Sequence, residues 1–241
     1  MDSHILIPKC VLKQFWDETS DHQLHIYNVE SKQYYTEHPK DYNAEENHYS
    51  IYTENFLSKK IETPLGNAIA RLKKFDGAGK VQINNAPIII KKYMNSLMCR
   101  SQGMKDEVCK RVLFRDKYTQ QNINDWCAID GLDDIEHDEF WNMFSACALR
   151  CNGDEEFVLT SKGYSEFVLQ DQFTFIIPLA PQIAACLYVD KSGDGCRIAH
   201  TVNYVKKINL FATKTQLDKG TGEIISSKEE NIKNLIEKCS E

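Results

Sequence analysis

The segment FTFIIPLAPQIAACLYVD, residues 173–190, contains two short apolar runs separated by a turn. FTFIIPL and IAACLYVD each have the length and the continuous apolar character of a buried β-strand. Pro178 and Pro181 bound the turn that we expect between them. A third run, EFVLT at 156–160, precedes this pair. The last third of the chain is therefore predicted to contain buried β-strands.

The first part of the chain has the patterns of a hairpin followed by helices. LHIYNVESKQYYTE, residues 24–37, alternates apolar and polar residues and then breaks at 30–32, as an antiparallel hairpin does. Apolar residues next recur at helical spacing over 56–75, with an interruption at Thr63-Pro64. We expect two strands and then a helical centre.

Three further segments predict helices in that centre. Asn84 or Asn85 is a suitable cap for a helix that starts near Pro87 and runs to about Gly103. Residues 104–117 and 138–151 predict two more. The second of these has its apolar residues on one stripe: Phe140, Trp141, Phe144, Cys147 and Ala148.

A helix is also predicted near each end. Pro8 suits the first turn of a helix, and apolar residues follow it at helical spacing. Ser227 and Glu230 form a capping box ahead of apolar residues, which predicts an amphipathic helix over about 227–239. With no low-complexity linker in between, we expect a single α+β domain over residues 1–241, with an N-terminal β-hairpin, a helical centre and C-terminal antiparallel strands.

The composition excludes several classes of protein. The chain of 241 residues is 42% hydrophobic and 27% charged, as ordinary globular proteins are. No apolar run approaches the ~20 residues that span a bilayer, and the first residues lack the order of a secretory signal. We expect a cytoplasmic protein without membrane contact. The nine cysteines follow no framework spacing and are expected to be reduced thiols.

Standard cofactor and metal motifs are incomplete. GAGK at 77–80 lacks the earlier glycine of a phosphate loop and the hydroxyl residue after its lysine, so a turn is expected. DKSGDG at 190–195 begins like a calcium loop, but Thr201 stands at the twelfth position. Cys147 and Cys151 have no companion histidine for zinc and are expected in the core. No cofactor or metal is predicted.

Charge is distributed unevenly along the chain, although the net charge is only −6. Residues 91–117 carry eight Lys and Arg against three Asp and Glu, whereas 118–160 carry ten Asp and Glu against Arg150 alone. The two segments either steer an anionic ligand to one face or attract each other within the fold, and we favour mutual attraction because adjacent segments of opposite charge commonly pack together. The carboxylates proposed to face a partner are Asp133, Asp134, Asp138 and Glu139.

Several short motifs follow one another in order along the chain. His4 precedes the run from Pro8 to Phe15, and LSKKIETPLGNAIARL contains a glutamate before a small-residue turn. FVLTSKGYSEF, FIIPLAPQIAACLY and VKKINLFA come later in the chain. In this order the motifs resemble the opening, the glutamate-bearing helix and the last three blocks of an uncharacterised family, domain of unknown function 4238. The resemblance covers roughly residues 3 to 215 and implies a fold without an assigned activity.

The resemblance also implies a group of polar positions in one pocket: His4, Glu62, Arg100, Ser161 and Asn209. Two features depart from the family pattern. His4 is separated from Pro8 by three residues rather than two, and TSKG places Ser161 or Lys162 where the family has an acid. A catalytic site that is present in the family is therefore expected to be impaired or altered in this chain.

Two functions compete on these observations. One is a hydrolase that acts on a phosphoryl or nucleic-acid substrate, with His4 as acid or base, Glu62 orienting it or holding a metal, and Arg100 binding the anion. The other, which we favour from sequence, is a non-catalytic or degenerate-site protein that binds another protein with a basic surface through DGLDDIEHDEFW, residues 130–141. A purely structural interpretation makes Glu62 and Arg100 a buried pair and His4 a satisfied polar group.

Overall fold

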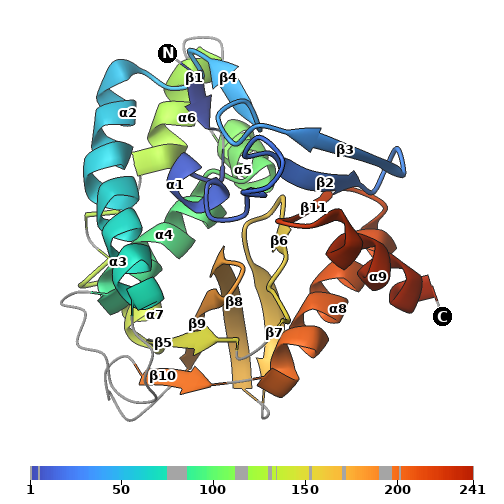
Figure 1. The fold of residues 1–241 in the computed structure, drawn as a ribbon. Coiled ribbons are helices and arrows are strands. Elements are labelled where there is room, and N and C mark those ends of the chain that lie inside the picture. The colour runs from blue at the N-terminus through green and yellow to red at the C-terminus, as the bar shows by residue number, and fades with distance from the viewer. Residues whose placement is uncertain are drawn as a thin grey trace.

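The computed structural model describes residues 2–4, 6–74, 86–111, 119–129, 132–133, 135–151, 154–169, 172–189, 197–200 and 202–240. Sheets lie in the centre of the molecule (Figure 1). Helices from the first half of the chain pack on one side of them, and α8 (Val202–Lys219) and α9 (Glu229–Ser240) pack on the other. The predicted α+β class is confirmed.

The largest sheet in the described residues has five strands in the order β10-β5-β9-β8-β7. Its members are β5 (Phe144–Arg150), β7 (Ser165–Leu169), β8 (Gln172–Ala180), β9 (Ile183–Val189) and β10 (Arg197–His200). Neighbours are antiparallel, except that β10 runs parallel to β5. The two strands predicted from residues 173–190 are therefore confirmed as inner strands of this sheet.

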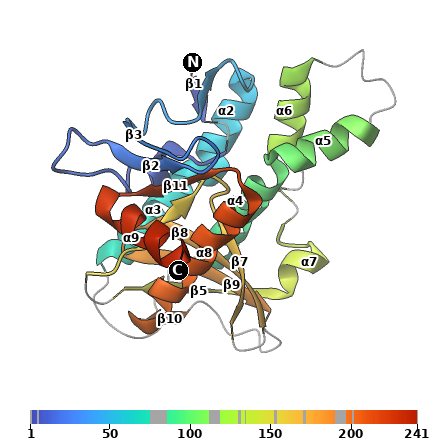
Figure 2. The ribbon, with the colours of Figure 1, turned by 90° about the vertical axis from the view of Figure 1, so that its right-hand side faces the viewer.

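Both faces of this sheet are covered, which explains the continuous apolar runs. Phe175 and Ile177 of β8 enter a cluster with Met94 from the helical layer. Ile176 between them faces the other way and packs with Val205 of α8. Figure 2 shows α8 lying across that second face. Because successive side chains of a strand point to opposite faces, a strand covered on both sides has apolar residues at consecutive positions.

The predicted position of the turn after β8 was wrong. Pro178 lies inside the strand, where the pairing with β9 shifts register between Pro178 and Ala180. The turn is formed instead by residues 181–182. A proline is tolerated at such an irregularity because no ladder hydrogen bond requires its missing N–H.

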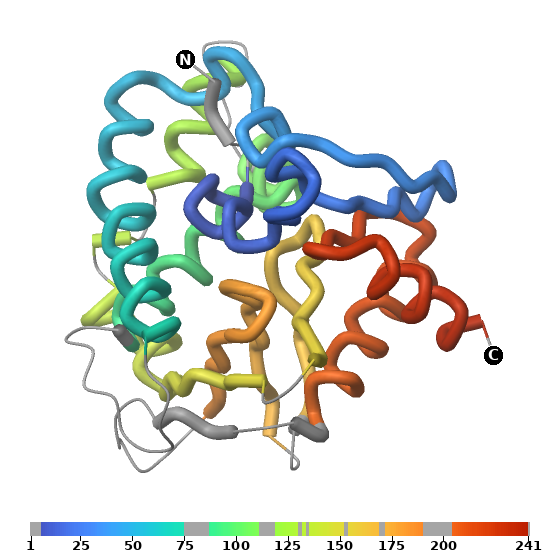
Figure 3. Tube along the Cα trace, in the orientation of Figure 1, coloured from blue at the N-terminus to red at the C-terminus, as the bar shows by residue number. Residues whose placement is uncertain are grey.

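A second sheet joins segments from both halves of the chain. In the described residues it has the order β3-β2-β11-β6. Its strands are β2 (Leu24–Asn28), β3 (Gln33–Glu37), β6 (Leu159–Thr160) and β11 (Glu223–Ser226). The predicted hairpin of β2 and β3 is confirmed. Figure 3 shows the blue segment with this hairpin beside the red segment with β11 and α9.

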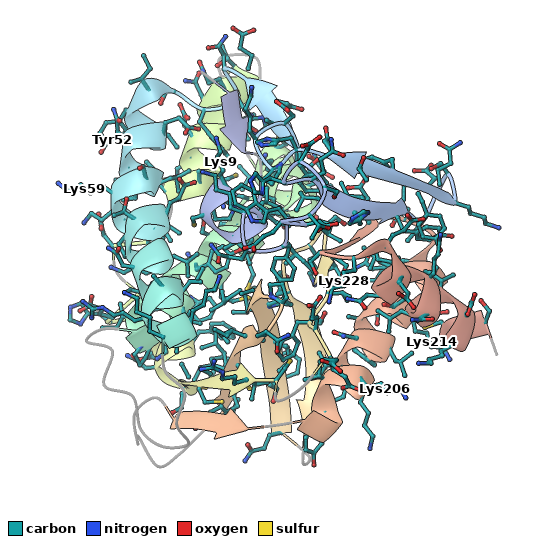
Figure 4. All side chains as sticks on the ribbon, in the orientation of Figure 1. Lys9, Tyr52, Lys59, Lys206, Lys214 and Lys228 are labelled. Carbon is teal, nitrogen blue, oxygen red and sulfur yellow. The ribbon has the colours of Figure 1, made fainter. Side chains whose placement is uncertain are left out.

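The helical layer begins with a long rod. The rod consists of α2 (Ile51–Leu57), the π-helical turn η1 (Ser58–Glu62) and α3 (Thr63–Lys74). The predicted interruption at Thr63-Pro64 takes the form of this π turn, because Pro64 cannot donate to the carbonyl four residues earlier. Tyr52 and Lys59 point outward from the rod (Figure 4). Behind it lie α4 (Ala86–Cys99), α5 (Gln102–Arg111) and α6 (Gln120–Ile129).

The shorter elements differ in part from the expectations. The helix predicted after Pro8 is only α1 (Lys9–Leu12). The helix expected over 87–103 ends at Cys99, and the next begins at Gln102. Residues 112–118 of the helix predicted over 104–117 lie outside the described residues. Helix α6 was not predicted.

The helix predicted over 138–151 was wrong. Only α7 (Glu139–Asn142) is helical, and Phe144–Arg150 form β5. Asp138 caps α7 through its carboxylate, which accepts a hydrogen bond from the Trp141 N–H at 3.1 Å. The seven residues of β5 pair in unbroken register with β9. Because the apolar spacing suits either structure, this tertiary pairing decides for the strand.

The last helix begins later than predicted. It starts at Glu229, and the Ser227 hydroxyl donates to Glu156 at 2.6 Å, which replaces the expected capping box. The eight cysteines that the structure describes are thiols rather than disulfides. GAGK at 77–80 and DKSGDG at 190–195 lie outside the described residues. Within the described parts of the chain, no helix combines the length and apolar character needed to cross a membrane.

Candidate functional site

Arg100 is the centre of a buried polar cluster at the end of α4. Only 2% of the residue is exposed. Its Nε donates to the Ser96 carbonyl at 3.4 Å, and a terminal nitrogen donates to the Leu6 carbonyl. The guanidinium also donates to the Tyr49 hydroxyl. Arg100 is thus held by protein groups and acts on its surroundings through its positive charge.

Glu62 lies close enough to Arg100 for the two charges to interact. It ends the π turn η1 and is largely buried. Burial raises the pKa of Glu62 above its ordinary value, and the positive charge of Arg100 opposes that rise. Cys10 of α1 is influenced by the same pair, and burial together with Glu62 raises the pKa of its thiol to about 12. Cys10 is therefore a protonated thiol at neutral pH.

Three further side chains form a line of contacts beside Arg100. Glu45 lies on β4 (Ala44–Glu46), and its Oε2 is 2.6 Å from Nδ1 of His48. Nε2 of the same imidazole is 3.0 Å from Nζ of Lys105. The exposed fractions run from 59% for the Glu45 side chain to 9% for that of His48 and 3% for Lys105. We call this line, from surface to interior, the Glu45–His48–Lys105 relay.

The electrostatics of the relay favour a neutral imidazole. Burial lowers the pKa of His48, the hydrogen bond to Glu45 partly opposes that shift, and the Lys105 charge adds to it. Burial and the positive charge of Arg100 also lower the pKa of Lys105. A carboxylate at Nδ1 assigns the imidazole proton to that nitrogen, and this leaves Nε2 as an acceptor.

Neighbouring elements hold the His48 loop in place. Asn47 has a positive φ of 57°, a conformation that asparagine adopts more readily than most residues. From α6, Asn124 donates to the His48 carbonyl at 3.2 Å, and Asp125 accepts from the Ser50 N–H at 2.8 Å. Helix α6 therefore fixes the backbone on both sides of the imidazole, and β4 and α6 lie at the same end of the molecule (Figure 1).

His4 lies next to this site in the backbone but its side chain is outside the described part of the structure. It belongs to β1 (Asp2–His4), opposite Ala44 of β4, rather than to the start of a helix. Sequence reasoning selected this histidine and missed Glu45, His48 and Lys105. The Glu-x-x-His spacing is the local signal that was available, and Lys105 lies 57 positions further along the chain.

Ser161 and Asn209 make different contacts from those of Glu62 and Arg100. The Ser161 hydroxyl accepts from the Glu223 N–H at 3.1 Å. Asn209 of α8 donates to the Glu156 carbonyl at 2.6 Å and accepts from the Val158 N–H at 3.2 Å. In the described residues, none of their hydrogen bonds involves the Arg100 cluster. Both side chains hold the backbone around β6 between α8 and β11.

The acidic segment is partly paired within the fold. Asp133 lies 3.1 Å from Nζ of Lys60, with both side chains exposed. Glu136 lies 3.7 Å from Nζ of Lys92, which belongs to the predicted basic segment. Asp138 caps α7, and Glu139 is exposed in its first turn. Asp134 lies outside the described residues. Some carboxylates of the acidic segment therefore pair with lysines of the fold, as internal attraction predicts. Others are exposed, as binding of a partner predicts.

A cavity of about 360 Å³ lies elsewhere, between the end of α1 and the β8–β9 turn. Lys13, Trp16 and Lys73 are among its lining residues. The members of the relay do not line it. This cavity therefore does not bring a ligand to His48.

No group of three or more His, Cys, Asp or Glu side chains in the described ranges is placed to hold a metal ion. Comparisons of the chain with family models, curated proteins and solved structures found no match. The resemblance to domain of unknown function 4238 therefore stays a prediction.

Proposed function

We propose that the chain is a hydrolase that acts on a phosphoryl or nucleic-acid substrate by general acid–base chemistry at the Glu45–His48–Lys105 relay. The observation that carries the proposal is a histidine held between a carboxylate at 2.6 Å and an ammonium at 3.0 Å. A general base must be neutral at the working pH and oriented by a partner. The lowered pKa of His48 and its contact with Glu45 supply both conditions.

Each residue has a distinct role in this proposal. Lys105, with Arg100 behind it, supplies the positive potential that attracts an anionic substrate. Lys105 occupies Nε2 of His48 and is 3% exposed, so the substrate phosphate must draw the ammonium outward before Nε2 can accept a proton from water. The water oxygen then bonds to phosphorus while the bond to the leaving oxygen on the opposite side breaks. The leaving oxygen takes its proton from solvent, and the imidazolium releases its own proton to solvent. Glu45 orients the ring and stabilises its charged form.

An assay of the purified full chain tests this function. The substrates are p-nitrophenyl phosphate, bis-p-nitrophenyl phosphate and a single-stranded RNA oligonucleotide, each with and without added Mg²⁺. We expect turnover of at least one substrate, and a loss on the order of 10²–10⁴-fold in kcat/KM for His48→Gln. The pH profile of the wild type should rise with a midpoint below the ordinary histidine value of about 6.5.

The matched control is His137→Gln, which changes an exposed histidine elsewhere and should leave the rate unchanged. Lys105→Met should raise KM more than it lowers kcat, because it removes a binding charge. The proposal is overturned if none of the three substrates is hydrolysed, or if His48→Gln retains the wild-type rate.

The surface of α7 favours a second function. Asp138 and Glu139 are exposed there beside Phe140 and Met143, whose exposed fractions are 43% and 50%. Exposed large apolar side chains next to carboxylates suit a partner that is basic and partly apolar. We infer that this surface would bind another protein with a basic surface, as the sequence predicted.

A further inference from the structure

Two cysteines face each other across the largest sheet. Cys147 of β5 and Cys186 of β9 are directly opposed in the antiparallel register. Opposed residues on adjacent antiparallel strands point to the same face, and the two thiols are hydrogen-bonded to each other. Cys186 is buried with 3% of its surface exposed, and Cys147 is half-buried at the edge of the cluster under α8.

The two thiols are chemically unequal. The hydrogen bond with Cys186 lowers the pKa of Cys147, against the effect of burial. The same hydrogen bond and burial both raise the pKa of Cys186. Cys147 is therefore the better nucleophile, and it is also the more accessible of the two. Cys186 is the opposed, buried thiol that can react with Cys147 once Cys147 is oxidised.

We propose that Cys147 and Cys186 form a redox site that reacts with hydrogen peroxide and closes to a disulfide. The Cys147 sulfur attacks one peroxide oxygen, the O–O bond breaks, and water leaves, so that Cys147 becomes a sulfenic acid. The Cys186 sulfur then attacks the Cys147 sulfur and displaces the hydroxyl as a second water. Two electrons pass from the two thiols to one peroxide molecule, which yields two molecules of water.

The sheet register places the two thiols close to disulfide distance. Directly opposed residues of an antiparallel pair have Cβ atoms about 4.5–5.5 Å apart, and a disulfide needs about 3.5–4.5 Å. A small movement of β5 and β9 toward each other is therefore sufficient for closure.

Two other described thiols, those of Cys151 and Cys239, are placed differently. Sγ of Cys151 contacts the Pro181 carbonyl at 3.8 Å, and burial raises the pKa of this thiol to about 12. Sγ of Cys239 contacts the Leu210 carbonyl at 3.7 Å. Each of these thiols hydrogen-bonds a carbonyl and has a raised pKa, so we expect them to react more slowly than Cys147. The site is independent of the relay and of the proposed hydrolase activity.

Peptide mapping of the full, natively folded chain tests the proposal. The reduced protein is treated with one equivalent of hydrogen peroxide, remaining thiols are alkylated, and the digest is analysed by mass spectrometry. We expect a Cys147–Cys186 cross-linked peptide that dithiothreitol reverses. In Cys186→Ser, a sulfenic acid should be trapped by dimedone at Cys147, while Cys151→Ser should cross-link like the wild type.

Two results contradict the proposal. One is a wild-type map in which the first cysteine oxidised is any other than Cys147 or Cys186. The other is a cross-link between these two that forms only after the chain is unfolded in denaturant. Because the wild-type map decides both outcomes, the test does not depend on how well the serine variants fold.

Discussion

Glu62 and Arg100 are buried together, but their charges are accommodated unequally. Arg100 donates to two backbone carbonyls and to Tyr49, which replace its hydration. The pKa of Glu62 is raised, so burial penalises its charge by more than Arg100 stabilises it. Removing the glutamate charge should therefore help the folded state at neutral pH, although the two residues are oppositely charged.

We predict that Glu62→Gln raises the melting temperature at pH 8 and has little effect near pH 4. A carboxyl whose pKa is raised on folding contributes stability below its unfolded value of about 4.5 and loses it as pH rises through the folded value. Glutamine stays neutral throughout that window. The measurement is thermal unfolding followed by circular dichroism at both values of pH.

Glu46→Gln is the control for this prediction, because Glu46 is exposed and should show no such pH dependence. A lower melting temperature of Glu62→Gln at pH 8 would show that the attraction to Arg100 outweighs the cost of burial. Glu62 would then be a structural ion-pair partner, and the prediction would be wrong.

Residues that meet across long sequence separations were the hardest part of the site to predict. Glu62 and Arg100 were predicted because each lies in a short motif that resembles the uncharacterised family. His48 and Lys105 come together only after β4, α5 and α6 have packed. Before that packing is known, nothing in the sequence distinguishes Lys105 from the other lysines of residues 91–117.

At the scale of elements, residues 173–190 were predictable and 138–151 were not. Both strands of the first segment are apolar at consecutive positions. Short continuous apolar runs of this kind are typical of buried strands, whereas a helix with one buried face has apolar residues only every three or four positions. In 138–151 the apolar residues satisfy a helical stripe, while the observed burial of β5 alternates along much of the strand. Pairing with β9 makes this segment a strand. The spacing of apolar residues does not reveal which strand a segment will pair with.

The acidic segment gives a prediction at this scale. Replacing Asp133, Asp138 and Glu139 together by Asn, Asn and Gln should change the unfolding free energy by less than about 1 kcal/mol. The Asp133–Lys60 pair is exposed, and such pairs contribute ~0–1 kcal/mol, while Asn caps a helix about as well as Asp. Urea unfolding at two ionic strengths measures this change.

The same variant tests the docking function. Capture of a basic protein partner by the variant should be weaker than capture by the wild type. High salt should weaken capture by the wild type more than capture by the variant, since ions screen exposed charges beyond ~10 Å at 0.1 M. Lys60→Gln serves as a control that keeps the carboxylates. A variant that melts earlier, mostly at low salt, and captures as much partner as the wild type would assign the segment to internal charge pairing.

For the whole molecule, β11 is the element that joins the separate parts of the core. Ile225 packs into the cluster beneath the helical layer, whereas Ile224 packs into the cluster under α9. On either side β11 pairs with β2, near the start of the sequence, and with β6, in its second half. Neither cluster is complete without this four-residue strand.

We predict that Ile225→Ala lowers the unfolding free energy by about 2–5 kcal/mol, the cost of truncating a fully buried isoleucine. Ile225 has no exposed surface. Ile51→Ala is the matched control, because 76% of Ile51 is exposed and its change should be close to zero. Urea titration measures both. Equal effects of the two substitutions would contradict the central role of β11.

The position of β11 between β2 and β6 also has a consequence for biosynthesis. Asn28 of β2 and Glu223 of β11, which hydrogen-bond in the finished sheet, are 195 positions apart. At roughly 5–20 residues per second, a ribosome needs about 10–40 s to make the intervening chain. During that time the edge of the newly made hairpin is open to pairing with other chains. Slow translation should therefore favour aggregation of this protein, and a chaperone that shields strand edges should raise its yield.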